Sequence, residues 1–295
     1  MSMIGLMVAM AVSSGVLLTS ISLLQMAREN FQNDHQAALL EDSAAFAVEI
    51  IARTLQQAAQ DDSLSPIEPR SDTSRFKLSD GPVQGLDDTR MSSDTISVGT
   101  TSVAGVSGND VMAVNLHSVD GGVVNCAGFV VPGASSQSAE SSWIFFHIAP
   151  GAGGEPDLHC KYRGQQKWDS QVIVSGVEYF QVLYGLDTDD DNLPNQYLSA
   201  SAVAEKDKAK PASDSSLWRR VVAVHVALVL RSATGSHQAS AFKGIALFGD
   251  DYVSENGRVD PGTRIHPADL APSVHARVRL HVEAVIFLHK PERVL

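Results

Sequence analysis

The chain has 295 residues, of which 44% are hydrophobic, and a formal net charge of −12 at neutral pH. This length is enough for one sizeable domain, or for two small ones, beside a long helix. A strongly acidic chain is a poor general binder of nucleic acids or anionic lipids, because recognition of phosphate needs clustered Lys and Arg. We therefore expect no nucleic-acid partner, although composition alone says nothing of a local basic patch.

The first 27 residues carry no ionised side chain, and the first charge along the chain is Arg28. A membrane-spanning helix needs about 20 mostly apolar residues, so residues 1–27 are long enough to cross a bilayer. A cleavable secretory signal would begin with basic residues and end at a small-residue cleavage site. Here no Lys or Arg precedes the apolar run, which favours a permanent anchor over a signal peptide.

Residues 28–60 are predicted to continue the same helix, because helical periodicity runs through them without Gly or Pro. Their apolar positions recur at steps of three, four, seven and eight, which predicts one apolar stripe that packs on a sheet. The predicted stripe consists of Phe31, Leu39, Phe46, Ile50, Ile51, Leu55 and Ala58. The opposite, polar face is predicted to carry Asn33, Gln36, Glu41 and Arg53.

Residues 61–295 are predicted to form a β-rich domain. Its first part, up to residue 108, is rich in Ser, Asp, Pro and Gly, which indicates loops with a short strand at 95–98. Residues 202–216, rich in Ala, Lys, Asp and Ser, are predicted to be a solvated loop. Apolar runs predict strands at 111–116, 122–131, 142–148 and 158–162, and a further apolar stretch covers 172–184.

Two later segments alternate cleanly between apolar and polar residues. The even positions are apolar in residues 220–230 and again in residues 274–288. Alternation with a period of two over this length predicts antiparallel strands that are buried on one face.

The chain has only two cysteines, Cys126 and Cys160, and both follow the apolar segment. In an exported domain an even pair of cysteines indicates a disulfide, because the compartment is oxidising. The alternative is a pair of unrelated buried thiols.

Several segments resemble type IV pilus subunits. Residues 1–10, Met-Ser-Met-Ile-Gly-Leu-Met-Val-Ala-Met, resemble the start of mature type IV pilins. Residues 52–56, the two cysteines and the block 177–191, which ends Tyr-Gly-Leu-Asp-Thr-Asp-Asp-Asp, resemble PilW-like minor pilins. The likeness extends from residue 1 to about residue 232 and is weaker in the final strand. It implies an α+β, type IV pilin-like fold, in which a long N-terminal helix, transmembrane in its first half, packs on an antiparallel β-sheet domain.

The resemblance also implies a function. The chain would be a minor pilin, a structural or priming subunit of type IV pilus assembly, and not an enzyme. Residues of the filament-core helix would be Met1, Ile4, Gly5, Leu6 and Met7. The partners would be other minor pilins and the major pilin, with no small-molecule substrate and no required cofactor.

The implied location is the inner membrane of a Gram-negative bacterium, with a single-pass anchor and a periplasmic C-terminal domain, and afterwards the extracellular pilus. One alternative is a minor pseudopilin of a type II secretion system. A second alternative is a calcium-dependent adhesin module at a pilus tip.

The chain departs from the family pattern in two ways. The basic leader and the Gly before the mature end are missing from the sequence, which indicates a processed chain or a gene start placed too late. Gly5 stands where most pilins have a Glu, whose carboxylate is thought to pair with the terminal amine of a neighbouring subunit. Without that carboxylate the subunit cannot neutralise a neighbour in this way, which gives a tip or priming position as one hypothesis and a tolerated substitution as the other.

Acidic residues alternate at Asp187, Asp189 and Asp191. A calcium loop of the EF-hand type begins Asp-x-Asp-x-Asp-Gly and ends with a Glu at its twelfth position. Here Asn192 replaces the Gly, and the twelfth position is Leu198, which cannot bind a cation. Calcium binding by the three Asp residues and a solvated acidic turn are therefore both predictions from this segment.

The histidines are predicted to be surface residues, because the short ligand spacings of a zinc site are missing. His275, His281 and His289 lie six and eight residues apart on the last strand, too far apart to bind one ion together. His147 and His159 flank a Gly-rich turn that lacks the Lys-Ser/Thr of a phosphate-binding loop. No serine-hydrolase elbow, zinc-protease motif or Cys–His nucleophile signature occurs, so we predict no catalysis.

Overall fold

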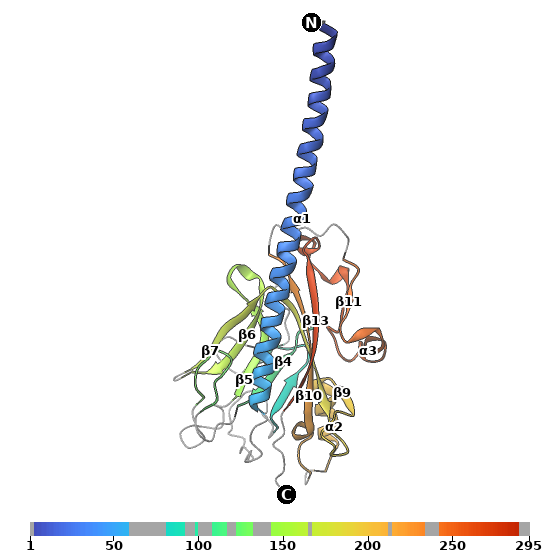
Figure 1. Ribbon diagram of the computed structural model, residues 1–295. Coiled ribbons are helices and arrows are strands. Elements are labelled where there is room, and N and C mark those ends of the chain that lie inside the picture. Colours follow the sequence, from blue (N-terminus) through green and yellow to red (C-terminus); the bar gives the residue numbers. More distant parts are fainter. Residues whose placement is uncertain are drawn as a thin grey trace.

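The dominant element is helix α1 (Met3–Ala58), which projects as a stalk from a β-rich head (Figure 1). With a rise of about 1.5 Å per residue, a helix of 56 residues is about 84 Å long. The computed structural model describes residues 3–58, 81–91, 98–99, 108–116, 122–131, 143–164, 167–211, 214–233 and 242–288. Together the long helix and the antiparallel strands on which it packs give the predicted α+β architecture.

The head is built on two antiparallel sheets. The first sheet has the strand order β1-β4-β5-β6-β7, with β1 (Val83–Leu86), β4 (Val111–Asn115), β5 (Trp143–Pro150), β6 (Pro156–Arg163) and β7 (Trp168–Ser175). The second has the order β13-β10-β8-β9, with β13 (Arg279–Phe287), β10 (Val221–Arg231), β8 (Val177–Leu186) and β9 (Gln196–Leu198).

Smaller elements flank these sheets. Two strand pairs are β2 (Arg90–Met91) with β3 (Val98–Gly99), and β11 (Ile245–Ala246) with β12 (Arg264–Ile265). The helices are α2 (Ala200–Lys208) and α3 (Gly249–Asn256), and the 3₁₀ turns are η2 (Ala152–Gly154), η3 (Leu217–Arg220), η4 (Pro267–Asp269) and η5 (Pro272–Val274). Of the short strand predicted at 95–98, residues 95–97 lie outside the described residues.

Strands β7 and β8 belong to different sheets although only Gly176 separates them. Gly176 has a φ of +78°, and a Cβ there would lie 2.7 Å from the backbone oxygen of Arg231. Its N–H donates to Asp157 Oδ1 (3.0 Å) and its carbonyl accepts from the Arg231 N–H (2.8 Å). Glycine is therefore required at this point, because other residues rarely adopt a positive φ and would clash here. The apolar stretch at 172–184 thus spans two strands and a change of sheet.

Helix α1 packs its distal half against strands of both sheets, β4 and β7 of the first and β10 and β13 of the second. Its buried face is formed by Leu40, Ala44, Ala47, Ile51, Thr54, Leu55 and Ala58. The predicted stripe is right for Ile51, Leu55 and Ala58. It is wrong for Phe31, Leu39 and Phe46, which are 73%, 47% and 49% exposed. Alanines at the centre of the contact let the helix approach the strands closely, which larger side chains would prevent.

Strand β10 is buried on both faces, contrary to the prediction of one buried face. Its even positions lie in the main core with α1, as the alternation predicts. Its odd positions include Ala227 and Val229, which are covered by Leu247 and Ile265 of the segment that follows β10. The alternation in the sequence could not predict this second layer. Small apolar residues at the odd positions are also compatible with a face exposed to solvent.

Two further predictions are wrong. Residues 200–208 form helix α2 rather than a solvated loop, because Val203 is buried and distant acceptors cap the helix. Asp87 accepts the N–H groups of Ala200 (2.9 Å) and Ser201 (2.7 Å), which a local pattern cannot reveal. Residues 122–131 form a turn with one bridge, Val124 to Val130, rather than a strand.

Side chains cap the outer edge of β8 where β9 does not pair with it. Asn109 Oδ1 accepts from the Phe180 N–H (2.7 Å), and Asp110 Oδ2 accepts from the Val182 N–H (2.8 Å). The Asp110 N–H donates to the Phe180 carbonyl (3.0 Å). These bonds tie the first sheet to the second and satisfy edge groups that would otherwise be exposed to another strand.

We expect Asp110→Ala to destabilise the head, because the buried Val182 N–H loses its acceptor, at a cost of about 1–3 kcal/mol. Asp110→Asn keeps an acceptor oxygen and should have a free energy of unfolding close to that of the native chain. Urea unfolding of the full chain in detergent, followed by tryptophan fluorescence, compares the two variants. Equal losses in both would show that the edge cap does not determine stability here.

Candidate functional site

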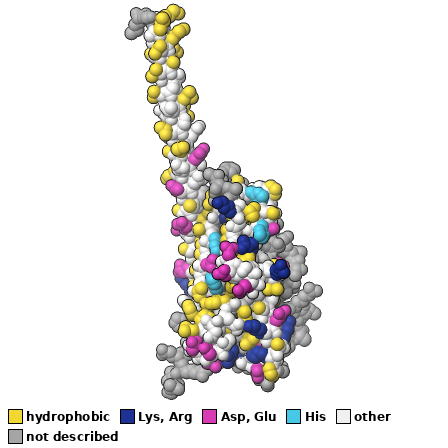
Figure 2. Space-filling model, turned by 90° about the vertical axis from the view of Figure 1, so that its right-hand side faces the viewer, with side chains coloured by type: hydrophobic (Ala, Val, Ile, Leu, Met, Phe, Trp, Pro, Cys, Tyr) yellow, Lys and Arg dark blue, Asp and Glu magenta, His cyan; other side chains and the backbone are white. Residues whose placement is uncertain are grey.

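The exposed half of α1 is the most unusual surface of the molecule. Residues 3–35 are all exposed, and hydrophobic side chains cover the stalk in Figure 2. Of the residues that the structure describes, α1 is the one helix long and apolar enough to cross a membrane, and its most apolar stretch is not buried in the head. Such a surface is unfavourable in water and needs an apolar environment.

The predicted filament-core residues lie in this half. Ile4, Leu6 and Met7 are exposed in the first turns of α1, and Met1 lies outside the described residues. Nothing lies within 4 Å of the position that a side chain at Gly5 would occupy. A larger residue at position 5 therefore meets no steric barrier within the chain itself.

Hydroxyl groups in the apolar half bond to the backbone of the same helix. Ser13, Ser20 and Ser22 donate to the carbonyls of residues four positions earlier, at 2.6–2.8 Å, and Thr19 donates to the Val16 carbonyl at 2.9 Å. Each of these hydroxyl donors has an acceptor within the helix and needs neither water nor another chain. The stalk can therefore enter a hydrocarbon environment without stranding these hydroxyls.

An apolar ridge continues from the stalk onto the part of α1 that docks on the head. It consists of Phe31, Leu39 and Phe46, seven or eight residues apart, and all three are exposed. This spacing places them on one side of the helix, beside the buried face rather than within it. The apolar ridge is therefore a surface that the head leaves uncovered.

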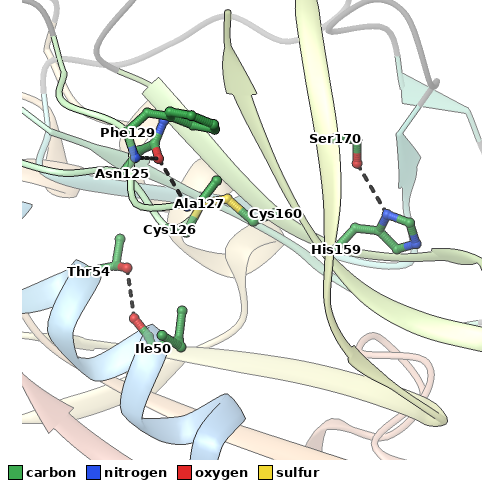
Figure 3. The surroundings of a disulfide bond; sticks show 9 residues. All are labelled: Ile50, Thr54, Asn125, Cys126, Ala127, Phe129, His159, Cys160 and Ser170. Carbon is green, nitrogen blue, oxygen red and sulfur yellow. Dashed lines mark hydrogen bonds between the residues drawn. A yellow bond between two sulfur atoms is a disulfide. The ribbon is translucent and has the colours of Figure 1, made fainter.

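A disulfide joins Cys126 to Cys160 on β6, with 6.3 Å between the Cα atoms, as the sequence predicts (Figure 3). The turn that carries Cys126 is shaped by Asn125 Oδ1, which accepts from the N–H groups of Ala127 and Phe129 at 3.0 Å. Its Val124 N–H donates to Gln57 Oε1 of α1 (3.2 Å). The turn is thus fixed to the first sheet and to α1. The chain-entropy model predicts that the disulfide stabilises the fold by about 3–4 kcal/mol.

The acidic loop brings Asp187, Asp189 and Asp191 together, with one oxygen of each within 4.8 Å of the others. Asp187 is buried and accepts the N–H groups of Asp190 (2.7 Å) and Asn192 (2.9 Å). Asn192 has a φ of 65°, the left-handed conformation that a glycine would adopt at this point of a calcium loop.

The same loop also has features that oppose a cation. The guanidinium of Arg220 lies 3.4 Å from Asp190 Oδ1 and donates to the Thr188 carbonyl (3.2 Å). Leu198, at the twelfth position, is part of β9 and offers no side-chain ligand. The three carboxylates therefore fit a calcium site in part, and calcium binding stays a prediction.

Five charged residues form a buried network between the sheets that the sequence did not reveal. Glu178 on β8 is bound by Arg231 (2.9 Å) and Arg279 (2.7 Å), and all three side chains are almost fully buried. Glu155, before β6, is bound by Arg231 and by Arg277 (2.9 Å). Hydrogen bonds from Arg277 and Arg231 hold the pKa of Glu155 at about 2. The network ties β6, β8, β10 and β13 together.

Two further buried ionisable groups are Asp260, between α3 and β12, and His147 on β5. Burial raises the pKa of Asp260 to about 7, with a contribution from Asp87, and Tyr252 donates to Asp260 Oδ2 (2.8 Å). On the first sheet His147 stacks on His159, with 5.6 Å between ring centroids. Burial, and then His159, lowers the pKa of His147 to about 3. His147 is therefore a core residue, and its prediction as a surface histidine is wrong.

These two groups should give opposite pH dependences of stability. Lys161, Arg90 and His159 surround His147, whose folded-state pKa is depressed, so its contribution is lost as pH falls from 6.5 towards about 3. Asp260 has a raised pKa, so its contribution is present below pH 3.8 and is lost as pH rises towards about 7.

We expect His147→Phe to gain stability relative to the native chain on acidification below pH 6.5, and Asp260→Asn to lose it. The difference should approach about 1.4 kcal/mol per pH unit for one proton. Urea unfolding between pH 4 and 7 measures both slopes. Parallel curves for the native chain and the two variants would contradict this assignment.

Residues 145–288 match the family model of PilW, described as type IV pilus-assembly protein W. The predicted resemblance to PilW is confirmed over these residues, which include the final strand β13. Among solved structures, a type IV-like pilin from Thermus thermophilus is similar with 15% identity, over 84% of this chain and 96% of its own, at a TM-score of 0.37. No curated protein sequence matches the chain significantly. Residues 145–288, just under half of the chain, are therefore similar to a type IV pilus-assembly family.

Proposed function

We propose that the chain is a minor pilin, a structural or priming subunit of a type IV pilus. The observation that carries the proposal is the uninterrupted helix α1, which is fully exposed and apolar in one half and docked on the head in the other. The PilW match supports the same conclusion. The role is structural rather than enzymatic.

The proposed mechanism is an exchange of apolar surroundings. Residues 1–27 would hold the subunit in the inner membrane as a single-pass anchor, and residues 28–60 would form the amphipathic half of the helix. Residues 61–295 would form the domain that lies in the periplasm and then on the extracellular pilus. During assembly the anchor would leave lipid for the helices of other minor pilins and the major pilin, a step for which its satisfied hydroxyls are suited.

The apolar ridge of α1 supports helix-to-helix packing in the assembled state. Phe31, Leu39 and Phe46 extend apolar surface beyond the membrane-spanning length, where lipid would no longer cover it. Packing against a neighbouring helix would remove these side chains from water. Each Å² of apolar area buried in this way would stabilise the contact by about 25 cal/mol.

We expect Phe46→Ser to reduce incorporation into sheared pili, because a contact with a neighbouring subunit loses apolar area. Phe46 is half exposed, so the isolated head should keep its stability. Val259→Ser, which also removes an exposed apolar side chain but from the head, is the matched control. Immunoblots of sheared pili and membranes measure incorporation, and equal amounts for native chain and Phe46→Ser would contradict a role for the apolar ridge.

Gly5 bears on the position of the subunit. In the pilins that this chain resembles, a carboxylate at position 5 is thought to pair with the N-terminal amine of a neighbouring subunit. Leaving either charge unpaired in an apolar core is costly. A subunit without this carboxylate suits a tip or priming position, where it has no such neighbour to neutralise.

We expect Gly5→Glu to enter the pilus shaft more often than the native chain, since the open surroundings of Gly5 accept a larger side chain. Gly5→Gln, of similar size but uncharged, is the control. Immunogold counts along pili measure the change. Equal counts for all three chains would favour a tolerated substitution instead.

A minor pseudopilin of a type II secretion system would share the helix and the head. Deletion of the gene separates the two functions: loss of surface pili supports the pilus subunit, whereas loss of protein export with pili intact supports the pseudopilin.

A calcium-dependent adhesin is favoured only by the acidic loop. If the loop binds calcium, isothermal titration of the full chain in detergent should detect one ion per chain, and Asp189→Asn should abolish it, because one of three carboxylate ligands is lost. Asp169→Asn, an acidic residue outside the loop, is the control. Absence of binding would leave a solvated acidic turn.

A further inference from the structure

The sequence contains a single Asp–Pro peptide bond, between Asp260 and Pro261. It lies between α3 and β12, in the segment that covers the outer face of the second sheet; α3 and β11 mark this segment in Figure 1. The proline nitrogen carries no hydrogen and is more basic than other peptide nitrogens, so it leaves more easily when the carbonyl carbon is attacked. The side-chain carboxyl group of the same aspartate can attack this carbon, because the two close a five-membered ring.

The fold buries one side of this bond and exposes the other. Asp260 is 1% exposed, whereas Pro261 lies at the surface. The turn between them and β12 is rigid, because Gly262 has a φ of +91° and a side chain there would clash with the Gly108 carbonyl. The carboxyl group is therefore shielded from water, while an amine released at Pro261 reaches solvent.

One oxygen of the Asp260 carboxyl group is held and the other is free. The Tyr252 hydroxyl donates to Asp260 Oδ2 at 2.8 Å. Oδ1 is buried and has no hydrogen-bond partner among the described residues. Such buried oxygens are rare in folded proteins, and a chemical role is one of the reasons for which they occur. The lone pairs of Oδ1 are thus available to the carbonyl carbon of the same residue.

The carbonyl group of the Asp–Pro bond is polarised by a buried hydroxyl. Thr263 Oγ1 donates to the Asp260 carbonyl oxygen at 2.8 Å, and Thr263 is fully buried. The carbonyl of Thr263 accepts the Leu247 N–H (2.7 Å), which fixes the residue in place. A donor at this oxygen stabilises the negative charge that develops on it during attack. In a site without water, one such donor accelerates acyl transfer about 10²–10³-fold.

We propose that the Asp260–Pro261 bond is a self-cleavage site, which the Asp260 carboxyl group cuts with Thr263 as the donor to the oxyanion. Oδ1 forms a bond to the carbonyl carbon, and the bond from this carbon to the proline nitrogen then breaks. The acid proton of the carboxyl group moves to the nitrogen, which leaves as a secondary amine. One water molecule opens the cyclic anhydride that remains and restores both carboxyl groups. Nothing is oxidised or reduced.

The surroundings keep the attacking carboxyl group in its neutral form, which carries the proton that the leaving amine needs. Burial, and then Asp87, raises the pKa of Asp260 to about 7. The titratable groups that face it are Tyr252 on α3, Asp87 after β1 and Asp110 before β4. Burial also raises the pKa of Tyr252, so its hydroxyl remains a donor. Cleavage should therefore slow as the pH rises above 7.

The cut would leave the head assembled. The fragment that begins at Pro261 contains β13, whose residues Arg279–Phe287 pair with β10 and contact α1. The fragment would thus stay in the second sheet without a covalent link to the rest of the chain. Because the geometry around Thr263 exists only in the folded head, cleavage would follow folding and could not be reversed by it.

The test follows the freshly purified full-length chain in detergent, with protease inhibitors, by intact mass at pH 5 and at pH 9. We expect two fragments, residues 1–260 and 261–295, whose masses add up to that of the chain plus one water. They should appear at least about tenfold more slowly at pH 9, because the carboxyl group has lost its proton. The chain unfolded in urea at pH 5 should also be cleaved more slowly, since Thr263 no longer contacts the carbonyl.

Thr263→Val and Thr263→Ser form the matched pair of variants. Thr263→Val loses the hydroxyl and should be cleaved at least about tenfold more slowly, whereas Thr263→Ser keeps it and should be cleaved at nearly the native rate. Asp260→Ala lacks the attacking group and should give no fragments. Circular dichroism checks that each variant is folded. An intact native chain at pH 5, equal rates for folded and unfolded chain, or equal rates for the two Thr263 variants would overturn the proposal.

Discussion

The structure depends on the close contact between the distal half of α1 and both sheets. Ala44 and Ala47 occupy the centre of this contact and Leu40, Ile51 and Leu55 fill its length, so one helix face supplies the core that β4, β7, β10 and β13 share. The helix covers apolar inner faces of both sheets, which also contact each other directly through β5, β6 and β8. The docked half thereby holds the exposed half in a fixed direction, as Figure 1 shows.

Polar contacts hold the two sheets in register around that core. Gly176 passes the chain from one sheet to the other, Asn109 and Asp110 close the outer edge of β8, and the Glu155–Glu178 network binds three arginines at the ends of β10 and β13. Each contact joins residues far apart in the sequence and satisfies groups that burial would otherwise penalise. Buried ion pairs of this kind favour one arrangement of the strands, because leaving any partner unpaired is costly.

Features with a strong local pattern could be predicted from the sequence. The helix follows from its uncharged start and unbroken periodicity, β10 and β13 follow from their alternation, and the disulfide follows from an even pair of cysteines. Features set by distant contacts could not. The end of α2 is capped by Asp87, more than a hundred residues earlier.

The histidines show the same limit. Spacing along one strand relates His281 only to His275 and His289, whereas in space Glu283 joins it to His225 on β10. The available signal was a polar residue at position 225 within an otherwise apolar strand. Using it requires the register of β10 against β13, which follows from the fold and not from spacing along one strand. The sequence pattern also predicts the wrong buried side of α1, because its large apolar residues outweigh the alanines that the sheets contact.

The contact between α1 and β13 joins the first helix of the chain to its last strand. Because the chain is synthesised from its N-terminus, Ala44, Ile51 and Leu55 emerge long before the strand that covers them has been made. The core can close completely only when residue 287 has emerged, so most of the head must wait in an open state until synthesis is nearly complete. Factors that shield the helix during this interval would determine how much of the protein reaches its folded form.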